Sequence, residues 1–180
     1  MRVISGTAGS IPLEYPRGAD IRPTTDAIRE FLFSSLADRV VDAVFCDVYA
    51  GAGTVGIEAL SRGAARCAFI EKDRRCLQAL ERNLEKTRLA DRARVLAGDA
   101  ARVYPVAAEA EGPFDIVFID PPYNLAAAGA LARRIVCDGL GVASGGLVIL
   151  QHGRDPFLAE PAPIREKRFG ETGISFYELP

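Results

Sequence analysis

Short apolar runs alternate with helical segments through the middle of this chain, and this alternation limits the possible folds more than any other feature. Within residues 73–88, for example, Cys76, Leu77, Leu80 and Leu84 recur at helical spacing. Strands separated by helices form parallel sheets with right-handed crossovers, so we expect an α/β fold with a mostly parallel sheet. The expected strands are 43–49, 66–71, 93–97, 114–119 and 146–151, and the expected helices are 55–62, 73–88, 100–110 and 125–137.

The two ends of the chain follow other patterns. Residues 2–5 and 11–15 predict a small hairpin, and the Pro-Thr-Thr-Asp sequence at 23–26 predicts the start of a helix. Residues 164–179, with Gly-Glu-Thr-Gly at their centre, predict an antiparallel hairpin. We therefore expect a single domain over 1–180, with a hairpin-and-helix extension at 1–40 and a Rossmann-like core at 41–180.

Composition excludes several classes of protein. With 49% apolar and 26% charged residues, the chain is typical of globular domains. It has no run of ~18 apolar residues and no apolar stretch at its start, so we expect neither a membrane span nor a signal peptide. The four cysteines match no zinc or haem spacing, which favours buried thiols in a reducing cytoplasm and no metal. The net charge of −2 means that a polyanion would have to bind a local basic patch.

The tetrapeptide Asp120-Pro121-Pro122-Tyr123 follows the expected strand 114–119, at the edge where ligands bind in open α/β sheets. Pro122 favours an extended conformation of its predecessor, which would hold the Asp120 carboxylate and the Pro121 carbonyl pointing one way. Two aligned acceptors suit a planar NH2 group, and Tyr123 adds a face on which a base could stack. The alternative interpretation is a strand-capping Asp followed by a proline turn.

A glycine-rich segment at 47–56 lies at a strand-to-helix junction. Gly51, Gly53 and Gly56 fit G-x-G-x-x-G, which allows a tight turn and close approach of the backbone to a ligand. Glu71, at the end of the next expected strand, suits ribose hydroxyls. NAD-binding sheets share this arrangement, so an NAD enzyme is an alternative on these residues alone.

Four acids, Asp47, Glu71, Asp99 and Asp120, end or follow four successive expected strands. In one parallel sheet they converge on one edge. A helix N-cap would explain any one of them, Asp99 above all. Together they predict a cationic ligand that carries hydroxyls and an amine, as S-adenosylmethionine does. An NAD enzyme leaves Asp47, Asp99 and Asp120 unexplained.

These motifs resemble, in order, those of S-adenosylmethionine-dependent amino-methyltransferases. The resemblance narrows to the RsmD-type family, which methylates the N2 amine of one guanine in small-subunit (16S) ribosomal RNA. It implies a Rossmann-like class I methyltransferase that acts, as a monomer, on RNA within the small subunit or an assembly intermediate. The narrower resemblance rests on residues 22–26, Arg29, Glu30, Phe33, 58–64 and 169–172.

Carried over to this chain, the resemblance implies a cofactor site. Asp47 and the glycines would hold the methionine end, Glu71 the ribose, and Asp99 the adenine. Thr24 and Thr25 would help to hold the methionine carboxylate. The expected cofactor-binding residues are Asp47, Ala50, Gly51, Gly53, Glu71, Lys72, Asp99, Ala100, Thr24 and Thr25.

The resemblance also implies the residues that handle the substrate. The catalytic set is expected to be Asp120, Pro121, Pro122 and Tyr123, with Tyr123 stacked on a flipped base. RNA contacts are expected from Arg22, Arg29 and Tyr123, and further cationic candidates are Arg17, Arg165, Lys167 and Arg168.

The sequence departs from the family pattern at two places. Residues 6–10 carry no charge, where the family commonly has a basic stretch, and Gln151-His152 stands where the family often has an acid. We expect His152 to be a polar loop residue. Three alternatives stay open: a DNA adenine-N6 methyltransferase, a protein-glutamine methyltransferase, and a cofactor-binding regulator without catalysis.

Overall fold

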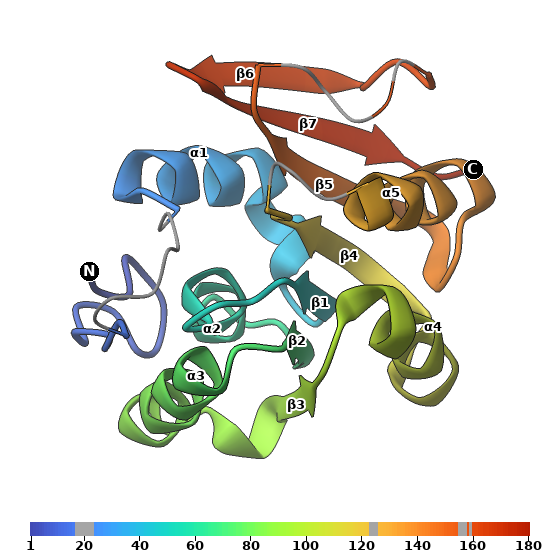
Figure 1. Ribbon diagram of the computed structural model, residues 1–180. Coiled ribbons are helices and arrows are strands. Elements are labelled where there is room, and N and C mark those ends of the chain that lie inside the picture. The colour runs from blue at the N-terminus through green and yellow to red at the C-terminus, as the bar shows by residue number, and fades with distance from the viewer. Residues whose placement is uncertain (17–23, 123–125, 155–157, 159) are drawn as a thin grey trace.

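A seven-stranded sheet forms the centre of the computed structural model, which describes residues 1–16, 24–122, 126–154, 158 and 160–180 (Figure 1). The strand order is β3-β2-β1-β4-β5-β7-β6. The first five strands are parallel, and β7 runs antiparallel between β5 and β6. The strands are β1 Val44–Val48, β2 Arg66–Glu71, β3 Ala93–Ala97, β4 Phe114–Ile119, β5 Val142–His152, β6 Arg165–Phe169 and β7 Thr172–Glu178.

Helices cover both faces of the sheet. Helices α1, α2 and α3 lie on one face and α4 and α5 on the other (Figure 1). In the described part of the chain, no helix combines the length and apolar character needed to cross a membrane. The helices are α1 Asp26–Leu36, α2 Thr54–Ser61, α3 Arg74–Thr87, α4 Ala100–Glu111 and α5 Ala126–Asp138, with short 3-10 turns η1 Ala37–Val40 and η2 Ala90–Arg92.

The pleat of the central strand divides the core into two layers. Phe45 packs under α1 to α3, whereas Cys46 and Val48 of the same strand pack under α4 and α5. Because successive side chains alternate, Asp47 faces the same layer as Phe45. The strand pattern therefore directs one buried acid toward the start of α2.

The expected α/β architecture and the C-terminal antiparallel hairpin are confirmed. Strand β5 begins earlier than expected, because Val142 pairs with Phe114 before a register shift, although Gly145 and Gly146 are typical of a loop. The expected N-terminal hairpin is reduced to a single antiparallel bridge between Arg2 and Pro12.

A buried carboxylate fixes the N-terminal segment to the core. Glu58, on α2, is fully buried and accepts hydrogen bonds from the Ile4 and Ser5 backbone N–H groups at 2.7 and 3.0 Å. It also pairs with Arg62 at 2.7 Å and with Arg29, on α1, at 3.5 Å. A buried charge is stable only when it is paired and hydrogen-bonded. Glu58 therefore joins three segments of the chain at one point.

Candidate active site

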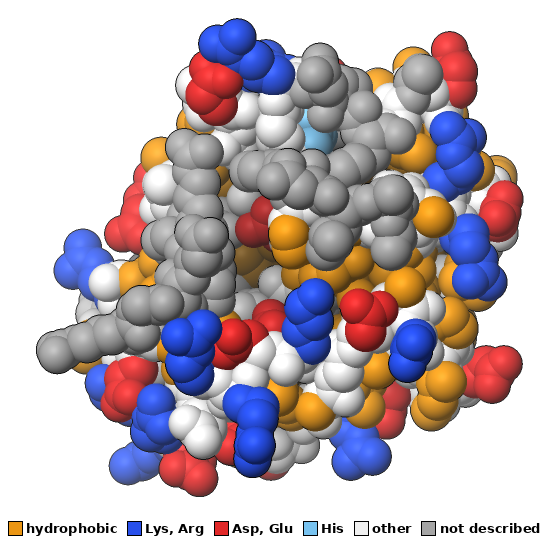
Figure 2. Space-filling model, viewed as in Figure 1, with side chains coloured by type: hydrophobic (Ala, Val, Ile, Leu, Met, Phe, Trp, Pro, Cys, Tyr) orange, Lys and Arg blue, Asp and Glu red, His pale blue; other side chains and the backbone are white. Residues whose placement is uncertain are grey.

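The four acids predicted to converge do lie on neighbouring strands at one edge of the sheet. Following the strand order β3-β2-β1-β4, they are Asp99, Glu71, Asp47 and Asp120. Three strand spacings of about 4.8 Å make this row roughly 15 Å long. Figure 2 shows acidic side chains near the centre of this face. The row therefore marks the candidate site.

The glycine loop between β1 and α2 leaves open space beside its backbone. Gly51 has φ +57°, and a Cβ there would meet no atom within 4 Å. Gly53 has φ +80°, and its Cβ would lie 2.2 Å from Leu80 Cδ1. A side chain at Gly53 would be strained by the positive φ and would displace Leu80, whereas Gly51, although buried, has open space beside it.

Asp47 is the most buried acid in the row, with 1% of its surface exposed. Its Oδ2 accepts a hydrogen bond of 2.8 Å from the Gly56 backbone N–H, in the first turns of α2. Burial raises the pKa of Asp47 to about 7 against the opposing Gly56 hydrogen bond, and the charge of Glu71 contributes to the rise. Asp47 therefore changes its charge close to neutral pH.

Glu71 holds the glycine loop against the end of β2. Its Oε2 accepts from the Gly51 N–H at 2.7 Å, and its Oε1 accepts from the Lys72 and Asp73 N–H groups at 2.7 and 2.8 Å. A carboxylate has about four acceptor positions. Three of them are engaged here, so Glu71 can accept a further hydroxyl while it keeps the loop in place.

Asp99 is exposed and caps α4, with its Oδ1 3.1 Å from the Ala101 N–H. The helix-cap interpretation of this residue is therefore confirmed. Capping leaves the second carboxylate oxygen available, so it does not exclude a ligand contact. The adjoining Ala100 is buried at the start of the same helix.

Asp120 leaves β4 beside two polar residues from distant parts of the chain. Thr24 Oγ1 lies 3.4 Å from Asp120 Oδ2 and 3.5 Å from Gln151 Oε1, at the end of β5. A hydroxyl donates one hydrogen, so Thr24 can donate to only one of these oxygens at a time. Thr24 was predicted to hold the cofactor, whereas the structure places it beside Asp120. Gln151 was not predicted as a site residue.

Only some of the other predicted substrate-handling residues lie within the part of the chain that the structure describes. Pro121 is buried and Pro122 is exposed. Tyr123, Arg22 and Arg17 lie outside the described residues, so their expected roles stay predictions.

Tyr15 also lies close to this edge, although no sequence pattern indicates it. Burial, the Cys76 thiol and the carboxylates of Asp120 and Glu71 together raise its pKa to about 12. The preceding residue is held by Asn83, which accepts from the Glu14 N–H at 2.7 Å and donates to its carbonyl at 3.0 Å. Asn83 also donates to the Ala52 carbonyl in the glycine loop at 3.0 Å. One buried side chain therefore joins the N-terminal segment to that loop.

Two expectations are corrected. Arg29 is fully buried, and its guanidinium bonds to Asp26 at 2.7 Å, to the Arg2 carbonyl at 2.8 Å and to Glu58. It therefore has no surface to offer RNA. His152 is not a loop residue but the buried last residue of β5, with its Nε2 2.9 Å from Ser175 Oγ. Thr25, predicted at the cofactor, caps α1 through the Ile28 N–H at 3.4 Å.

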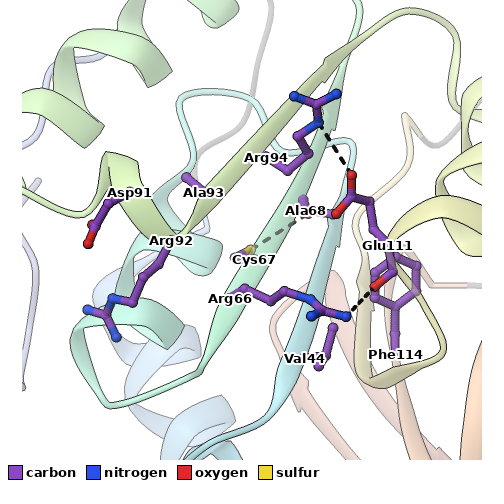
Figure 3. Close-up of a pocket in the computed structure, with 10 residues that line it drawn as sticks. All are labelled: Val44, Arg66, Cys67, Ala68, Asp91, Arg92, Ala93, Arg94, Glu111 and Phe114. Carbon is purple, nitrogen blue, oxygen red and sulfur yellow. Dashed lines mark hydrogen bonds and ion pairs between the residues drawn. The ribbon is translucent and has the colours of Figure 1, made fainter.

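A cavity of about 210 Å³ opens at the opposite edge, where β1, β2 and β3 begin (Figure 3). The arginines that line this cavity form hydrogen bonds and an ion pair within the protein. Arg66 donates to the Glu111 carbonyl at 2.9 Å, Arg94 pairs with the Glu111 carboxylate at 3.4 Å, and Arg92 donates to two carbonyls of the α2 region. The cavity is therefore a structural feature away from the acidic row.

Comparison with known proteins decides the family. A profile of the family described as "Conserved hypothetical protein 95" matches residues 1–178. The chain belongs to this family. The Bacillus subtilis protein YlbH, whose name marks it as a candidate rRNA methyltransferase, is 33% identical over 99% of this chain and 98% of its own length. Ribosomal RNA small subunit methyltransferase D of Escherichia coli is 43% identical over 69% of this chain and 61% of its own length. The predicted RsmD-type membership is confirmed.

The fold also agrees with that of a solved structure. An RNA methyltransferase from Salinibacter ruber, in complex with S-adenosyl-L-homocysteine, superimposes with a TM-score of 0.69 over 88% of this chain and 94% of its own. At 22% identity this likeness concerns the fold alone. The chain therefore has the Rossmann-like class I methyltransferase fold that the sequence predicted.

Proposed function

We propose that this protein transfers a methyl group from S-adenosylmethionine to the exocyclic N2 amine of a guanine in small-subunit ribosomal RNA. The observation that carries the proposal is the position of Asp120 and Pro121 at the end of β4, beside the acids of β1 and β2. The family of the chain and the names of its relatives support RNA as the substrate. A cytoplasmic monomer that acts on the subunit or an assembly intermediate belongs to the same proposal.

The acidic row supplies a contact for each part of the cofactor. Asp47 would face the ammonium group, and the open backbone at Gly51 would accept the methionine end. Glu71 has an acceptor position left for a ribose hydroxyl, and the second oxygen of Asp99 would accept from the adenine amine. When bound, the cofactor supplies an activated methyl group.

On the substrate side, the protein positions an amine. The Asp120 carboxylate and the Pro121 carbonyl would accept hydrogen bonds from the two N–H groups of the target NH2, which leaves its lone pair directed at the methyl group. As the nitrogen takes the methyl group, the sulfonium becomes a thioether, and the methylated amine then loses one proton. Positioning and preorganised acceptors account for most of the rate increase in such a step. The Thr24 hydroxyl, 3.4 Å from Asp120, would hold the carboxylate in the required orientation.

A comparison of different methyl-accepting substrates tests which class of molecule the protein methylates. We expect labelled methyl transfer to small ribosomal subunits that lack the modification, and none to duplex DNA or to glutamine-containing peptides. DNA or peptide labelling at a comparable rate would instead support the adenine or glutamine alternatives.

Cofactor affinity is expected to depend on pH through Asp47. Its pKa of about 7 means that the carboxylate must lose a proton before it can pair with an ammonium group. Because binding favours the charged form, affinity should rise with pH by up to about tenfold per unit between about pH 5.5 and 7 and then level off. Calorimetry in buffers of different ionisation enthalpy would detect the released proton. D47N should bind weakly without this pH dependence, and a pH dependence retained in D47N would exclude Asp47 as its source.

Replacing Thr24 separates its two candidate roles. T24V removes the hydroxyl and keeps the shape of the side chain. If Thr24 holds Asp120, kcat should fall about five- to tenfold, the effect of about one hydrogen bond, while cofactor affinity is unchanged. T24S, which keeps the hydroxyl, should restore kcat. A loss of cofactor affinity with normal kcat would instead support the predicted contact of Thr24 with the methionine carboxylate of the cofactor.

A further inference from the structure

One face of the edge strand, β6, carries two cations that rest on aromatic rings. Arg165 Cζ lies 4.9 Å from the centroid of Phe31, on α1, and Lys167 Nζ lies 5.1 Å from the same ring. Lys167 also lies 5.6 Å from the centroid of Phe169, whose ring is 5.5 Å from that of Phe31. These four residues are called the β6 basic surface below.

The pleat of β6 explains why these side chains share a face. Arg165 and Lys167 stand opposite Phe176 and Ile174 of β7, both of which belong to the core layer under α1. Alternate residues of a strand point to the same side. Both cations are exposed at the rim of that layer. In Figure 2, one group of Lys and Arg side chains lies at the top of the molecule, next to an acidic side chain, in the region of β6 in Figure 1.

The two cations lack an acidic partner. Among the described residues, no carboxylate lies within ion-pair distance of Arg165 or Lys167, whereas the nearby Arg168 and Arg154 pair with Glu166 and Glu171. Two like charges on one ring repel each other, and an anion placed between them would relieve that repulsion. The rings also restrict the long side chains, so less conformational entropy is lost when an anion binds.

The β6 basic surface lies beside the proposed active site. Phe169 pairs with Thr172 of β7, and the adjoining Gly173 pairs with His152, which follows Gln151 in β5. Two strand spacings, about 10 Å, therefore separate the end of β6 from the end of β5. Gln151 in turn contacts Thr24, which contacts Asp120. An RNA strand with one base at Asp120 could place its neighbouring phosphates on Arg165 and Lys167.

We propose that the β6 basic surface binds the RNA backbone next to the target nucleotide. This inference rests on the proposed function. Positive charge without carboxylates favours a polyanion, and the guanidinium plane of Arg165 provides a platform for an unstacked base. The surface would also supply the local basic patch that the net charge of −2 and the uncharged segment 6–10 require.

The test compares two double variants with the same change in charge. R165Q/K167Q removes both cations of the surface, and R133Q/R134Q removes two exposed arginines of α5, on the opposite face of the sheet. We expect R165Q/K167Q to bind a protein-free fragment of small-subunit RNA roughly tenfold or more weakly. Its salt slope should be smaller by about 1.4, because each single-strand phosphate that a cation neutralises adds ~0.7 to the slope. R133Q/R134Q should stay within about twofold of the wild type, since these arginines face away from the RNA. Cofactor affinity should be unchanged in both.

A third variant tests the role of the ring. F31L keeps both cations and an apolar side chain, so RNA affinity should fall because the cations are no longer held side by side. Binding of F31L equal to wild type would overturn this part of the proposal. If the wild type methylates RNA and R165Q/K167Q binds RNA as the control does, the β6 basic surface is excluded while the proposed function stands. If the wild type neither binds nor methylates RNA, both are overturned.

Discussion

Replacing Asp120 by alanine is expected to abolish methyl transfer and to leave the affinity for S-adenosylmethionine within several-fold of the wild type. Asp120 lies at the end of β4, whereas the acids proposed to hold the cofactor lie on β1 and β2 and in the loop after β3. The variant should therefore lose the acceptor that positions the amine and keep the cofactor site. We expect a decrease in kcat of roughly 10³-fold or more, as for the removal of a preorganised electrostatic contact in a transition state.

Single-turnover methyl transfer and calorimetric cofactor binding, measured together, check this expectation. D138A, which removes an exposed acid at the end of α5, serves as the matched control and should behave as the wild type. Near-normal turnover in D120A would contradict the proposed mechanism. A parallel loss of cofactor affinity would show that Asp120 belongs to the cofactor site instead.

Replacing Arg29 by methionine is expected to destabilise the protein strongly. The guanidinium is fully buried between Asp26, the Arg2 carbonyl and Glu58, so its removal leaves the buried Glu58 carboxylate with one fewer cation. Breaking a buried ion pair typically costs about 3–5 kcal/mol. For a chain of this size that corresponds to a decrease in Tm of about 6–20 °C.

R39M provides the matched control for Arg29. Arg39 pairs with Glu178 at 2.8 Å, but both side chains are more than 40% exposed. Exposed pairs contribute about 0–1 kcal/mol, so R39M should melt close to the wild type. If R29M and R39M melt at the same temperature and R29M alone binds RNA weakly, the structural role of Arg29 is wrong. The result would then support the predicted contact of Arg29 with RNA.

The parallel core could be predicted because its signals are local. The strands β2, β3 and β4 are rich in apolar residues and match the expected ranges residue for residue. The acids Glu71 and Asp120 sit at fixed positions relative to those strands, so the strand order alone brings them to one edge. The same reasoning placed the glycine loop correctly between β1 and α2.

The interactions that could not be predicted join residues far apart in the chain. Thr24 and Asp120 are separated by 96 positions, and Ile4 and Glu58 by 54. Arg29 was misinterpreted because arginine is rarely buried, and its burial is favourable here through Asp26, the Arg2 carbonyl and Glu58, which no local pattern indicates as its partners. The position of His152 was wrong because no pattern around a single histidine indicates how far a strand continues, and β7 pairs with it to the end of β5.

Analysis of the methylated nucleoside tests the central claim most directly. Small ribosomal subunits that lack the modification would be incubated with the protein and labelled S-adenosylmethionine, and their RNA digested and separated by mass. The account predicts N2-methylguanosine as the labelled product, formed by the wild type and absent with D120A. Label in methyladenosine, in ribosomal protein or in no product would contradict it.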